Sequence, residues 1–345
     1  MERSIMIFAC AVVLNNYVAL ASFVLPGGLD FKDDAKEINA RLEIVSKGKQ
    51  LEFGEIDCAG YELLLSRVSQ MRHLQGLNLI FQKVPYDGFV IECERLAGLT
   101  NLTSLSISSY ASNSVRVSSI SVCKRMPLKE LGLMYVYVDG AAVVGEFTRL
   151  EDLSCTTEEL VRCAPSGLKA LWVEKAKFKG EVDLSRFRKM ESLCLCNVKC
   201  KSIRGLGSLT ELEWLQLVGM PVKNLSDMKS CSRLRSLEIC NCREFDEKFE
   251  VADFKCFPLE CLALENVPVK CIRGLENCPL KDLRIDGVAI ESMDDICRLP
   301  NLERLDLTTT KIRLVDKEQV KDRFPKLESL TYMDQEGDVQ CIEWE

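Results

Sequence analysis

Residues 212–217 read LEWLQL, residues 234–239 read LRSLEI and residues 302–307 read LERLDL. Leucine or isoleucine fills the first, fourth and sixth positions of each hexad, and mostly polar residues stand between them. Alternation over the last three positions is typical of a short β-strand with one buried face. The sequence therefore predicts the same strand at each of these places.

The hexad recurs, with small apolar variation, from residue 74 almost to the end of the chain. About twelve copies are present, starting at residues 74, 102, 128, 150, 168, 190, 212, 234, 259, 280, 302 and 327. Between copies the apolar residues are spaced by three, as in Leu225, Met228 and Cys231, which predicts a short 3₁₀-like or helical return segment. One unit cannot bury its apolar face alone, so the copies are expected to stack around a continuous core.

This pattern resembles the leucine-rich repeat family, in its short form of about 22 residues per repeat. The resemblance implies an α/β fold: a right-handed solenoid, or horseshoe, with parallel strands on the concave face and short 3₁₀ or α return segments. We expect a repeat domain over 71–333, an amino-terminal cap over 22–70, and an acidic carboxyl-terminal tail over 334–345 that closes the other end. Trp344 is expected to fold back onto that end.

The turn after each strand departs from the family pattern. The family usually places Asn or Cys at the ninth repeat position, where this chain has mostly Val, Ala or Met. One place earlier stand residue types that tolerate a left-handed backbone, namely Asn197, Gly219, Asn241, Asn266 and Gly287. The sequence predicts that backbone conformation, and not a buried asparagine ladder, makes this turn.

The amino terminus has the features of a secretory signal peptide over residues 1–21. Arg3 precedes an apolar run from Ile5 to Leu14, and Ala19 to Ala21 is a small-residue cleavage signature. These features favour a secreted or extracellular protein, and sequons at Asn101 and Asn224 would then be available for glycosylation. An amphipathic cap helix of a cytoplasmic protein is the alternative. No later apolar run reaches the length of a membrane span, so we expect none after signal removal.

Composition argues against most catalytic chemistry and against nucleic acid. The 345 residues include 45 Lys plus Arg against 52 Asp plus Glu, a net charge of −7, with no basic block to neutralise phosphates. His73 is the only histidine, so a multi-histidine metal site is excluded. We therefore expect a non-catalytic chain without cofactor or metal.

Eighteen cysteines suggest two further sites. Cys196 and Cys240 resemble metal ligands, but the repeat places them two strand spacings apart, about 9.6 Å, too far for one zinc ion. Cys231, Cys256 and Cys278 form a column in adjacent coils, where either disulfide bridges or buried thiols would fit.

The concave face is the expected binding surface, because the third, fifth and seventh repeat positions point out of the sheet there. Its expected partner-binding residues are Trp172, Glu174, Lys175, Cys194, Cys196, Trp214, Gln216, Val218, Glu238, Arg284 and Asp306. Trp172 and Trp214 would either wall a groove floored by small residues or shelter the neighbouring strands. The predicted function is a protein-protein interaction module with an unidentified protein partner and oligomeric state. The alternative is an intracellular regulatory scaffold of the phosphatase-regulator or splicing-adaptor kind.

Overall fold

The computed structural model describes residues 50–53, 65–66, 68–81, 84, 86–110, 115–223, 225–242, 244, 254–255, 257–269, 272–296, 298–312 and 317–344. They belong to two compact units: unit 1 runs to Arg149 and unit 2 begins at Leu150. The predicted signal peptide and most of the predicted amino-terminal cap lie outside the described residues.

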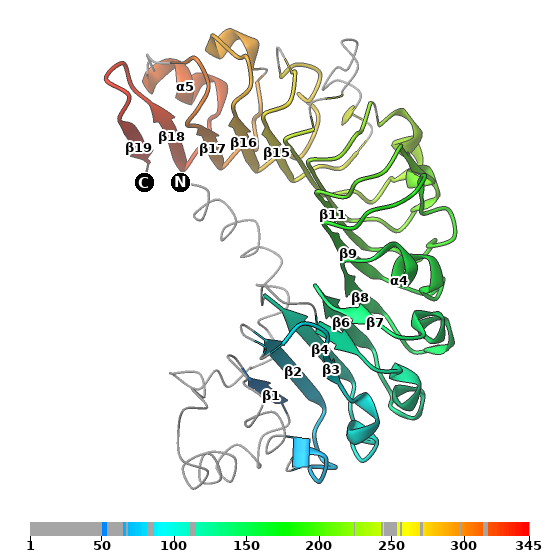
Figure 1. The fold of residues 1–345 in the computed structure, drawn as a ribbon. Helices are drawn as coiled ribbons and strands as arrows, with labels where there is room; N and C mark the ends of the chain where they lie inside the picture. Colours follow the sequence, from blue (N-terminus) through cyan, green and yellow to red (C-terminus); the bar gives the residue numbers. More distant parts are fainter. Residues whose placement is uncertain are drawn as a thin grey trace, which may run out of the picture. The chain divides into compact units, whose positions relative to one another are not determined.

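Unit 1 contains a parallel main sheet and a smaller parallel sheet beside it (Figure 1). The main sheet has the order β1 (Gln50–Phe53), β2 (Gly76–Phe81), β4 (Ser104–Ser109), β6 (Glu130–Met134). The smaller sheet consists of β3 (Phe89–Ile91), β5 (Val115–Val117) and β7 (Tyr137–Val138). Return segments are completed by the 3₁₀ helices η1 (Cys93–Leu96), η2 (Ile120–Arg125) and η3 (Ala141–Glu146).

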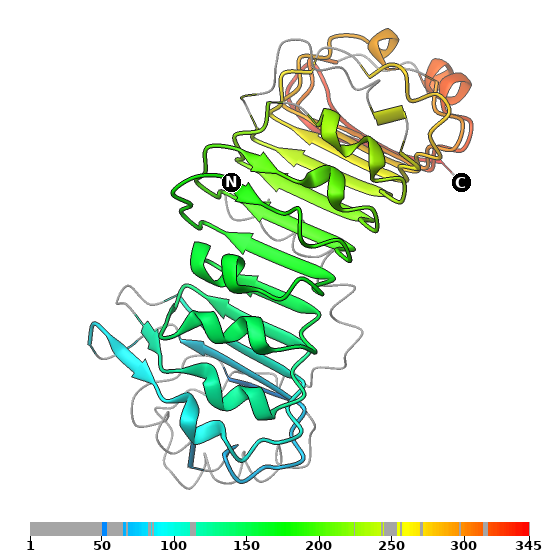
Figure 2. The same ribbon diagram turned by 90° about the vertical axis from the view of Figure 1, so that its right-hand side faces the viewer.

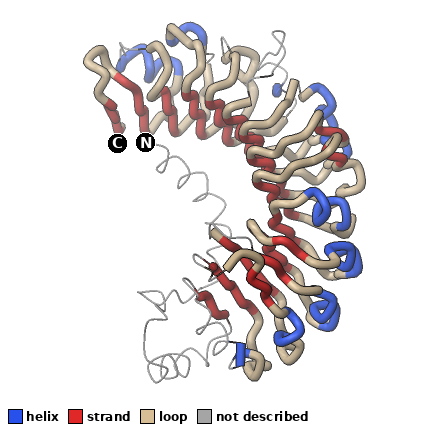
Figure 3. Tube along the Cα trace, viewed as in Figure 1, coloured by secondary structure: helices blue, strands red, loops and turns tan. Residues whose placement is uncertain are grey.

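Unit 2 carries the longer run of coils. Its parallel strands are β8 (Asp152–Cys155), β9 (Ala170–Glu174), β11 (Ser192–Cys196), β13 (Trp214–Val218), β14 (Ser236–Cys240), β15 (Cys261–Glu265), β16 (Asp282–Asp286), β17 (Arg304–Leu307) and β18 (Ser329–Met333). Figure 2 shows these strands side by side and pointing the same way. Figure 3 shows them on the inner side of the unit, with helices on the outer side.

The return segments of unit 2 are short and varied. They contain α4 (Glu158–Cys163), β10 (Val182–Asp183), β12 (Ile203–Arg204), η4 (Leu206–Ser208), η5 (Ser226–Ser230), η7 (Met293–Asp295) and α5 (Lys317–Arg323). The paired short strands β10 and β12, like β3, β5 and β7, are additions to the predicted 3₁₀ and α segments. Apolar spacing did not reveal them because two or three residues are too few to show a period.

The predicted leucine-rich-repeat fold, with parallel strands and short return segments, is confirmed, and each predicted hexad contains a strand. Register is kept from coil to coil: Leu193 pairs with Leu215, and Leu215 with Leu237. These leucines are completely buried. Each strand thus presents one face to the core and leaves the third, fifth and seventh repeat positions on the other face.

The prediction that backbone conformation makes the turn is also confirmed. Asn197, Gly219, Asn241, Asn266 and Gly287 all have positive φ, as do Tyr135 and Lys175. In this conformation the backbone N–H points to the next coil. The N–H of Asn197 donates to the Val218 carbonyl at 2.7 Å, and the N–H of Gly219 donates to the Cys240 carbonyl at 2.8 Å. From β9 to β15 the ladder of each strand is thereby extended by one hydrogen bond.

The acidic tail forms the last strand of unit 2. β19 (Val339–Glu343) pairs with β18 and is antiparallel to it, unlike the repeat strands. Trp344 follows, with its backbone N–H bonded to the Glu328 carbonyl at 2.9 Å and its ring 5.1 Å from the Lys321 ammonium. None of the helices in the described part of the chain is long and apolar enough to cross a membrane.

Candidate functional site on the concave sheet of unit 2

The concave sheet of unit 2 is the side of β8 to β18 that faces away from the core. Strand register aligns its residues in three rows, one for each outward repeat position. The central row contains Ser154, Trp172, Cys194, Gln216, Glu238, Ala263, Arg284 and Asp306. The predicted partner-binding residues lie in these three rows, apart from Lys175, which follows β9.

Two members of the central row are covered, although they point out of the sheet. Cys194 is 2% exposed and Gln216 is 3% exposed, whereas Trp172 of the same row and Trp214 of the third-position row are half-buried. Of the three small residues predicted to floor the groove, Cys194 is buried, while Ser192 and Cys196 are half-buried. Cys194 and Gln216 were expected to contact a partner, but in this arrangement their neighbours hide them from solvent.

A chain of hydrogen bonds runs across three strands beneath this cover. The Cys194 thiol donates to Oε1 of Gln216 at 3.0 Å, and Nε2 of Gln216 donates to Oε2 of Glu238 at 2.7 Å. Gln216 thus uses both ends of its amide, which fixes its orientation. Hydrogen bonds of this kind explain why a buried amide is tolerated on the sheet.

Glu238 is a carboxyl group in a poorly solvated place. Burial raises its pKa, and the nearby charges of Asp282 and Glu265 act in the same direction. The hydrogen bond from Gln216 and the charge of Arg284 oppose the rise. Removing a carboxylate from water favours its neutral form, so a cation brought to Glu238 would restore its charge.

Both indole N–H groups lack an acceptor. Nε1 of Trp172 and Nε1 of Trp214 are buried and have no hydrogen-bond partner. Since each side chain is half-buried and its single polar atom is covered, the part that reaches solvent is carbon. The two tryptophans therefore act as an apolar cover and keep an apolar outer surface.

Charge is distributed unevenly along the three rows. From β8 to β15, all of whose residues the structure describes, the rows contain carboxyl groups and neither lysine nor arginine. These carboxyl groups belong to Asp152, Glu174, Glu238 and Glu265. Arg284 and Arg304 appear only on β16 and β17, where they pair with Asp306 at 3.7 Å and Asp282 at 2.8 Å.

Asp152 is a site residue that the sequence reasoning missed. It is at the third repeat position of β8, opposite Ala170. Because third positions point out of the sheet, the repeat pattern could have identified it. Burial raises its pKa to about 7. Like the carboxyl group of Glu238, that of Asp152 is largely shielded from water.

Two asparagines at the carboxyl ends of the strands join neighbouring coils, whereas Lys175 pairs at 3.3 Å with Glu174 of its own coil. The Asn241 amide donates to Oε1 of Glu265 at 3.1 Å. The Asn266 amide donates to Oδ1 of Asn241 at 3.0 Å. Val218 is half-buried between Cys196 and Cys240 in the seventh-position row.

The cysteines of unit 2 are not arranged for nucleophilic chemistry. Cys196 and Cys240 are separated by the strand that carries Val218, as the sequence predicted. Burial raises the pKa of the Cys240 thiol, with the charges of Glu265 and Glu238 adding to the rise, so thiolate is disfavoured. Among the described residues, no three His, Cys, Asp or Glu side chains are grouped to hold a metal ion.

The predicted cysteine column is only partly described. Cys231 and Cys278 are buried, with their thiols donating to the carbonyls of Leu206 and Phe257 at 3.4 and 3.9 Å. Cys256, which separates them in the column, lies outside the described residues. The choice between bridges and buried thiols stays a prediction.

The predicted glycosylation sites are likewise partly described. Asn101 is exposed, and its amide donates to the Arg72 carbonyl at 2.8 Å. Asn224 lies outside the described residues.

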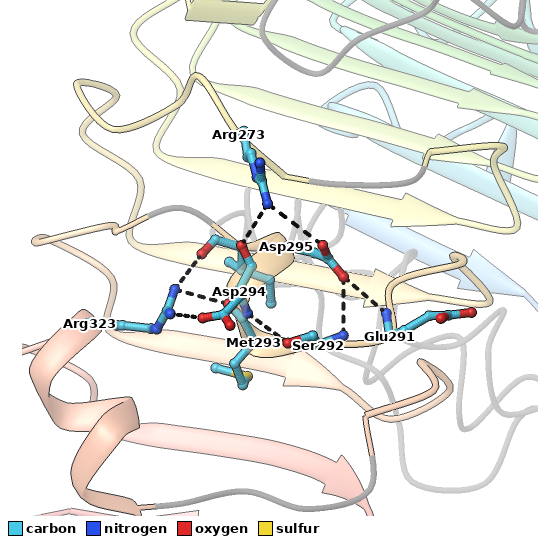
Figure 4. Close-up of polar contacts among 8 residues, drawn as sticks. Arg273, Glu291, Ser292, Met293, Asp294, Asp295 and Arg323 are labelled. Atoms are coloured by element: carbon cyan, nitrogen blue, oxygen red, sulfur yellow. Dashed lines mark hydrogen bonds and ion pairs between the residues drawn. The ribbon is translucent and has the colours of Figure 1, made fainter.

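A second polar cluster in unit 2 has a structural explanation (Figure 4). Arg323 of α5 donates to the carbonyls of Met293 and Ile296 at 3.1 Å each and pairs with Asp294. Arg273, from another coil, donates to the Asp294 carbonyl at 3.2 Å. The two guanidinium groups satisfy carbonyls at the end of η7, so the cluster joins return segments and leaves no site for a ligand.

Comparisons with known proteins give the fold. No protein-family model matches the sequence, and no curated protein matches it. Among solved structures, the chain is similar to an internalin, InlF, from Listeria monocytogenes: 19% identity, 88% of this chain and 96% of that chain covered, TM-score 0.54. It is also similar to TLR13 in its complex with ssRNA13: 17% identity, 85% of this chain and 54% of that chain covered, TM-score 0.51.

Proposed function

The chain is a leucine-rich-repeat protein, and from this premise we propose that it is a non-catalytic binding module that takes a protein partner on the concave sheet of unit 2. The observation that carries the proposal is the outer surface of Trp172 and Trp214. Two half-buried indoles present carbon to solvent on one face of a parallel sheet. Tryptophan in such a position is frequently the anchor of a protein interface.

The titratable groups of the concave sheet support a binding role over catalysis. The raised pKa of Cys240 keeps its side chain in the thiol form. Cys194 is buried and hydrogen-bonded to Gln216. Arg284 and Arg304 are paired with aspartates. No histidine stands in these rows to serve as the general base of acyl- or phosphoryl-transfer chemistry.

The carboxyl groups in the outward rows of the concave sheet support a protein, and not a nucleic acid, as the partner. TLR13, to which the fold is similar, has a solved complex with ssRNA13. Binding of a phosphate backbone needs lysine and arginine at the interface. From β8 to β15 the outward rows of this chain offer carboxyl groups instead.

We further propose that the protein is secreted, with cleavage after Ala21, on the strength of Arg3 and the apolar run that follows. The cytoplasmic scaffold is the alternative. Mass spectrometry of protein from its native source separates the two. A first residue of Ser22, or a glycan on Asn101, would support export, and an intact terminus would contradict it.

The binding role is tested with a pair of matched serine variants. Ser236 is on β14 between Trp214 and Cys261, whereas Ser232 is exposed in a return segment. Ser236→Tyr places bulk on the concave sheet and should abolish capture of the partner from native extract, while Ser232→Tyr should not. Equal recovery with both variants would move the interface away from this sheet.

A further inference from the structure

We propose that the partner presents a basic segment, with arginine or lysine side chains seated over Trp172 and Trp214 and against the carboxyl groups of Asp152, Glu174, Glu238 and Glu265. This inference rests on the proposed function, because it names the chemistry of a partner for the same surface. It is carried by charge complementarity between that segment and the concave sheet of unit 2.

Carboxyl groups outnumber basic side chains around the two tryptophans. The outward rows of β8 to β15 hold four carboxyl groups and no basic side chain. Of the four, Glu174 has a lysine within 4 Å, since Lys175 is 3.3 Å away. The hydrogen-bond partners of Glu238 and Glu265 that the structure records are neutral: the amides of Gln216, Asn241 and Asn266 and the Cys240 thiol. Neutral donors orient a carboxylate without neutralising it, and the charge of Arg284 offsets that of Glu238 only in part.

The arginines on β16 and β17 offset this negative charge only in part. Arg304 pairs with Asp282 at 2.8 Å, and Arg284 with Asp306 at 3.7 Å. Together with Asp286, the rows of β16 and β17 contain three carboxyl groups against two guanidinium groups. The outward rows of β8 to β17 therefore contain more carboxyl groups than basic side chains, with the largest excess over β8 to β15.

The apolar surface of the concave sheet is formed by indole rings, which can bind cations. An indole ring attracts a cation over its face, and arginine stacks on it as well. Trp172 is separated from Trp214 by the single strand β11, whose outward residues Ser192, Cys194 and Cys196 are small. One extended segment of the partner can thus place neighbouring basic side chains on the two indole rings and against the Glu238 carboxyl group.

The test uses full-length protein and two labelled peptides, hexa-arginine and hexaglutamate. Hexa-arginine should bind and change the tryptophan fluorescence, its affinity should fall as NaCl rises, and hexaglutamate should not bind. Glu238→Gln keeps an acceptor for Gln216 and removes the charge, so it should weaken hexa-arginine binding about threefold to tenfold. Trp172→Leu should weaken it by a similar factor.

Two further variants complete the design. Glu265→Gln is a second concave-sheet substitution in case Glu238→Gln fails to fold, and Asp227→Asn is the matched control, because Asp227 is exposed on η5 outside the sheet. Absence of hexa-arginine binding, equal binding by hexaglutamate, or equal weakening by Asp227→Asn would overturn the inference.

The result is distinguishable from failure of the proposed function. If Ser236→Tyr still captures the native partner, the concave sheet is not the interface and both proposals fail. If Ser236→Tyr loses the partner but Glu238→Gln and 0.5 M NaCl (on the order of a 4 Å Debye length) leave capture unchanged, the sheet binds a partner that is not basic. Only the inference about charge is then wrong.

Discussion

At the scale of single residues, the concave sheet contains a covered polar layer under a partly apolar surface. Gln216 links the Cys194 thiol to the Glu238 carboxyl, and the two tryptophans stand beside this chain of hydrogen bonds. A side chain that points out of a strand is usually replaceable at little cost. Here the outward residues also hold one another in place, so their substitutions should affect stability as well as binding.

Gln216→Ala is expected to destabilise unit 2 by about 1 to 3 kcal/mol. The substitution leaves the Cys194 thiol and the Glu238 carboxyl without their partner in a covered place, and an unmade buried hydrogen bond has that order of cost. Its outward position alone would predict a loss below about 0.5 kcal/mol. Urea unfolding of Gln216→Ala beside Ser232→Ala, an exposed control, measures the difference. Equal urea midpoints for the two variants would show that the hydrogen bonds of Gln216 do not stabilise unit 2.

Trp214→Phe is expected to cost less than about 1 kcal/mol, and Trp214→Ala about 2 kcal/mol. Phenylalanine keeps most of the ring and removes an N–H that has no acceptor, so it loses packing but relieves an unpaired donor. Alanine uncovers the strands on either side. Guanidinium unfolding of the two variants provides the comparison, and similar losses would mean that the ring does not act as a cover.

Asp152→Asn should change how stability depends on pH. Burial raises the folded-state pKa of Asp152 to about 7, so the folded protein holds this proton more tightly than the unfolded chain. Its contribution is fully present below the ordinary pKa of aspartate, about 4, and is lost as pH rises toward 7. Asparagine removes that loss. We expect equal melting temperatures at pH 4 and a higher one for Asp152→Asn at pH 8, and a lower one at pH 8 would contradict this assignment.

At the scale of elements, the left-handed residue that follows most strands of unit 2 determines how one coil meets the next. Its N–H extends the ladder, and its position leaves little space beside it. A β-carbon on Gly219 would be 2.4 Å from Oδ1 of Asn197. The φ of +60° is unfavourable for alanine, and this contact leaves little room for its β-carbon.

Gly219→Ala is accordingly expected to cost about 1 to 3 kcal/mol. Gly180→Ala is the matched control, because a β-carbon there would meet nothing within 4 Å and its φ is not positive. It should be neutral or slightly stabilising, since alanine restricts the unfolded chain. Thermal unfolding of both variants decides the matter: a Gly219→Ala protein as stable as Gly180→Ala would show that the Asn197 side chain moves aside freely.

The contrast between Asn197 and Gln216 shows what sequence can predict for this fold. The position of Asn197 after a strand follows from the repeat period and its residue type, both local properties, and its conformation was predicted. The burial of Gln216 depends on side chains contributed by two other coils, about 22 residues away in either direction. β19 was missed for a similar reason, because its pairing partner β18 is what makes it a strand.

At the scale of the whole molecule, stability in a repeat protein is close to a sum over coils and their interfaces. Interior coils of unit 2 have a neighbour on each side, as Leu215 has Leu193 and Leu237. β18 has the repeat strand β17 on one side and the antiparallel β19 on the other. The tail thus supplies the backbone hydrogen bonds that a further coil would otherwise give, and it covers a strand edge that would attract other chains.

Removal of residues 334–345 is expected to lower the melting temperature by at least about 5 °C and to cause concentration-dependent association. β18 would lose its pairing from Ser329 to Met333, and the ring of Trp344 would leave the Lys321 ammonium. Trp344→Phe separates the two effects, because it keeps β19 and changes only the ring, so its shift should stay below about 2 °C. Calorimetry with light scattering at two protein concentrations measures both. A shortened protein that melts at the wild-type temperature and stays monomeric would show that β18 needs no cover, whereas an equal loss in Trp344→Phe would assign the stabilisation to the indole and not to the strand.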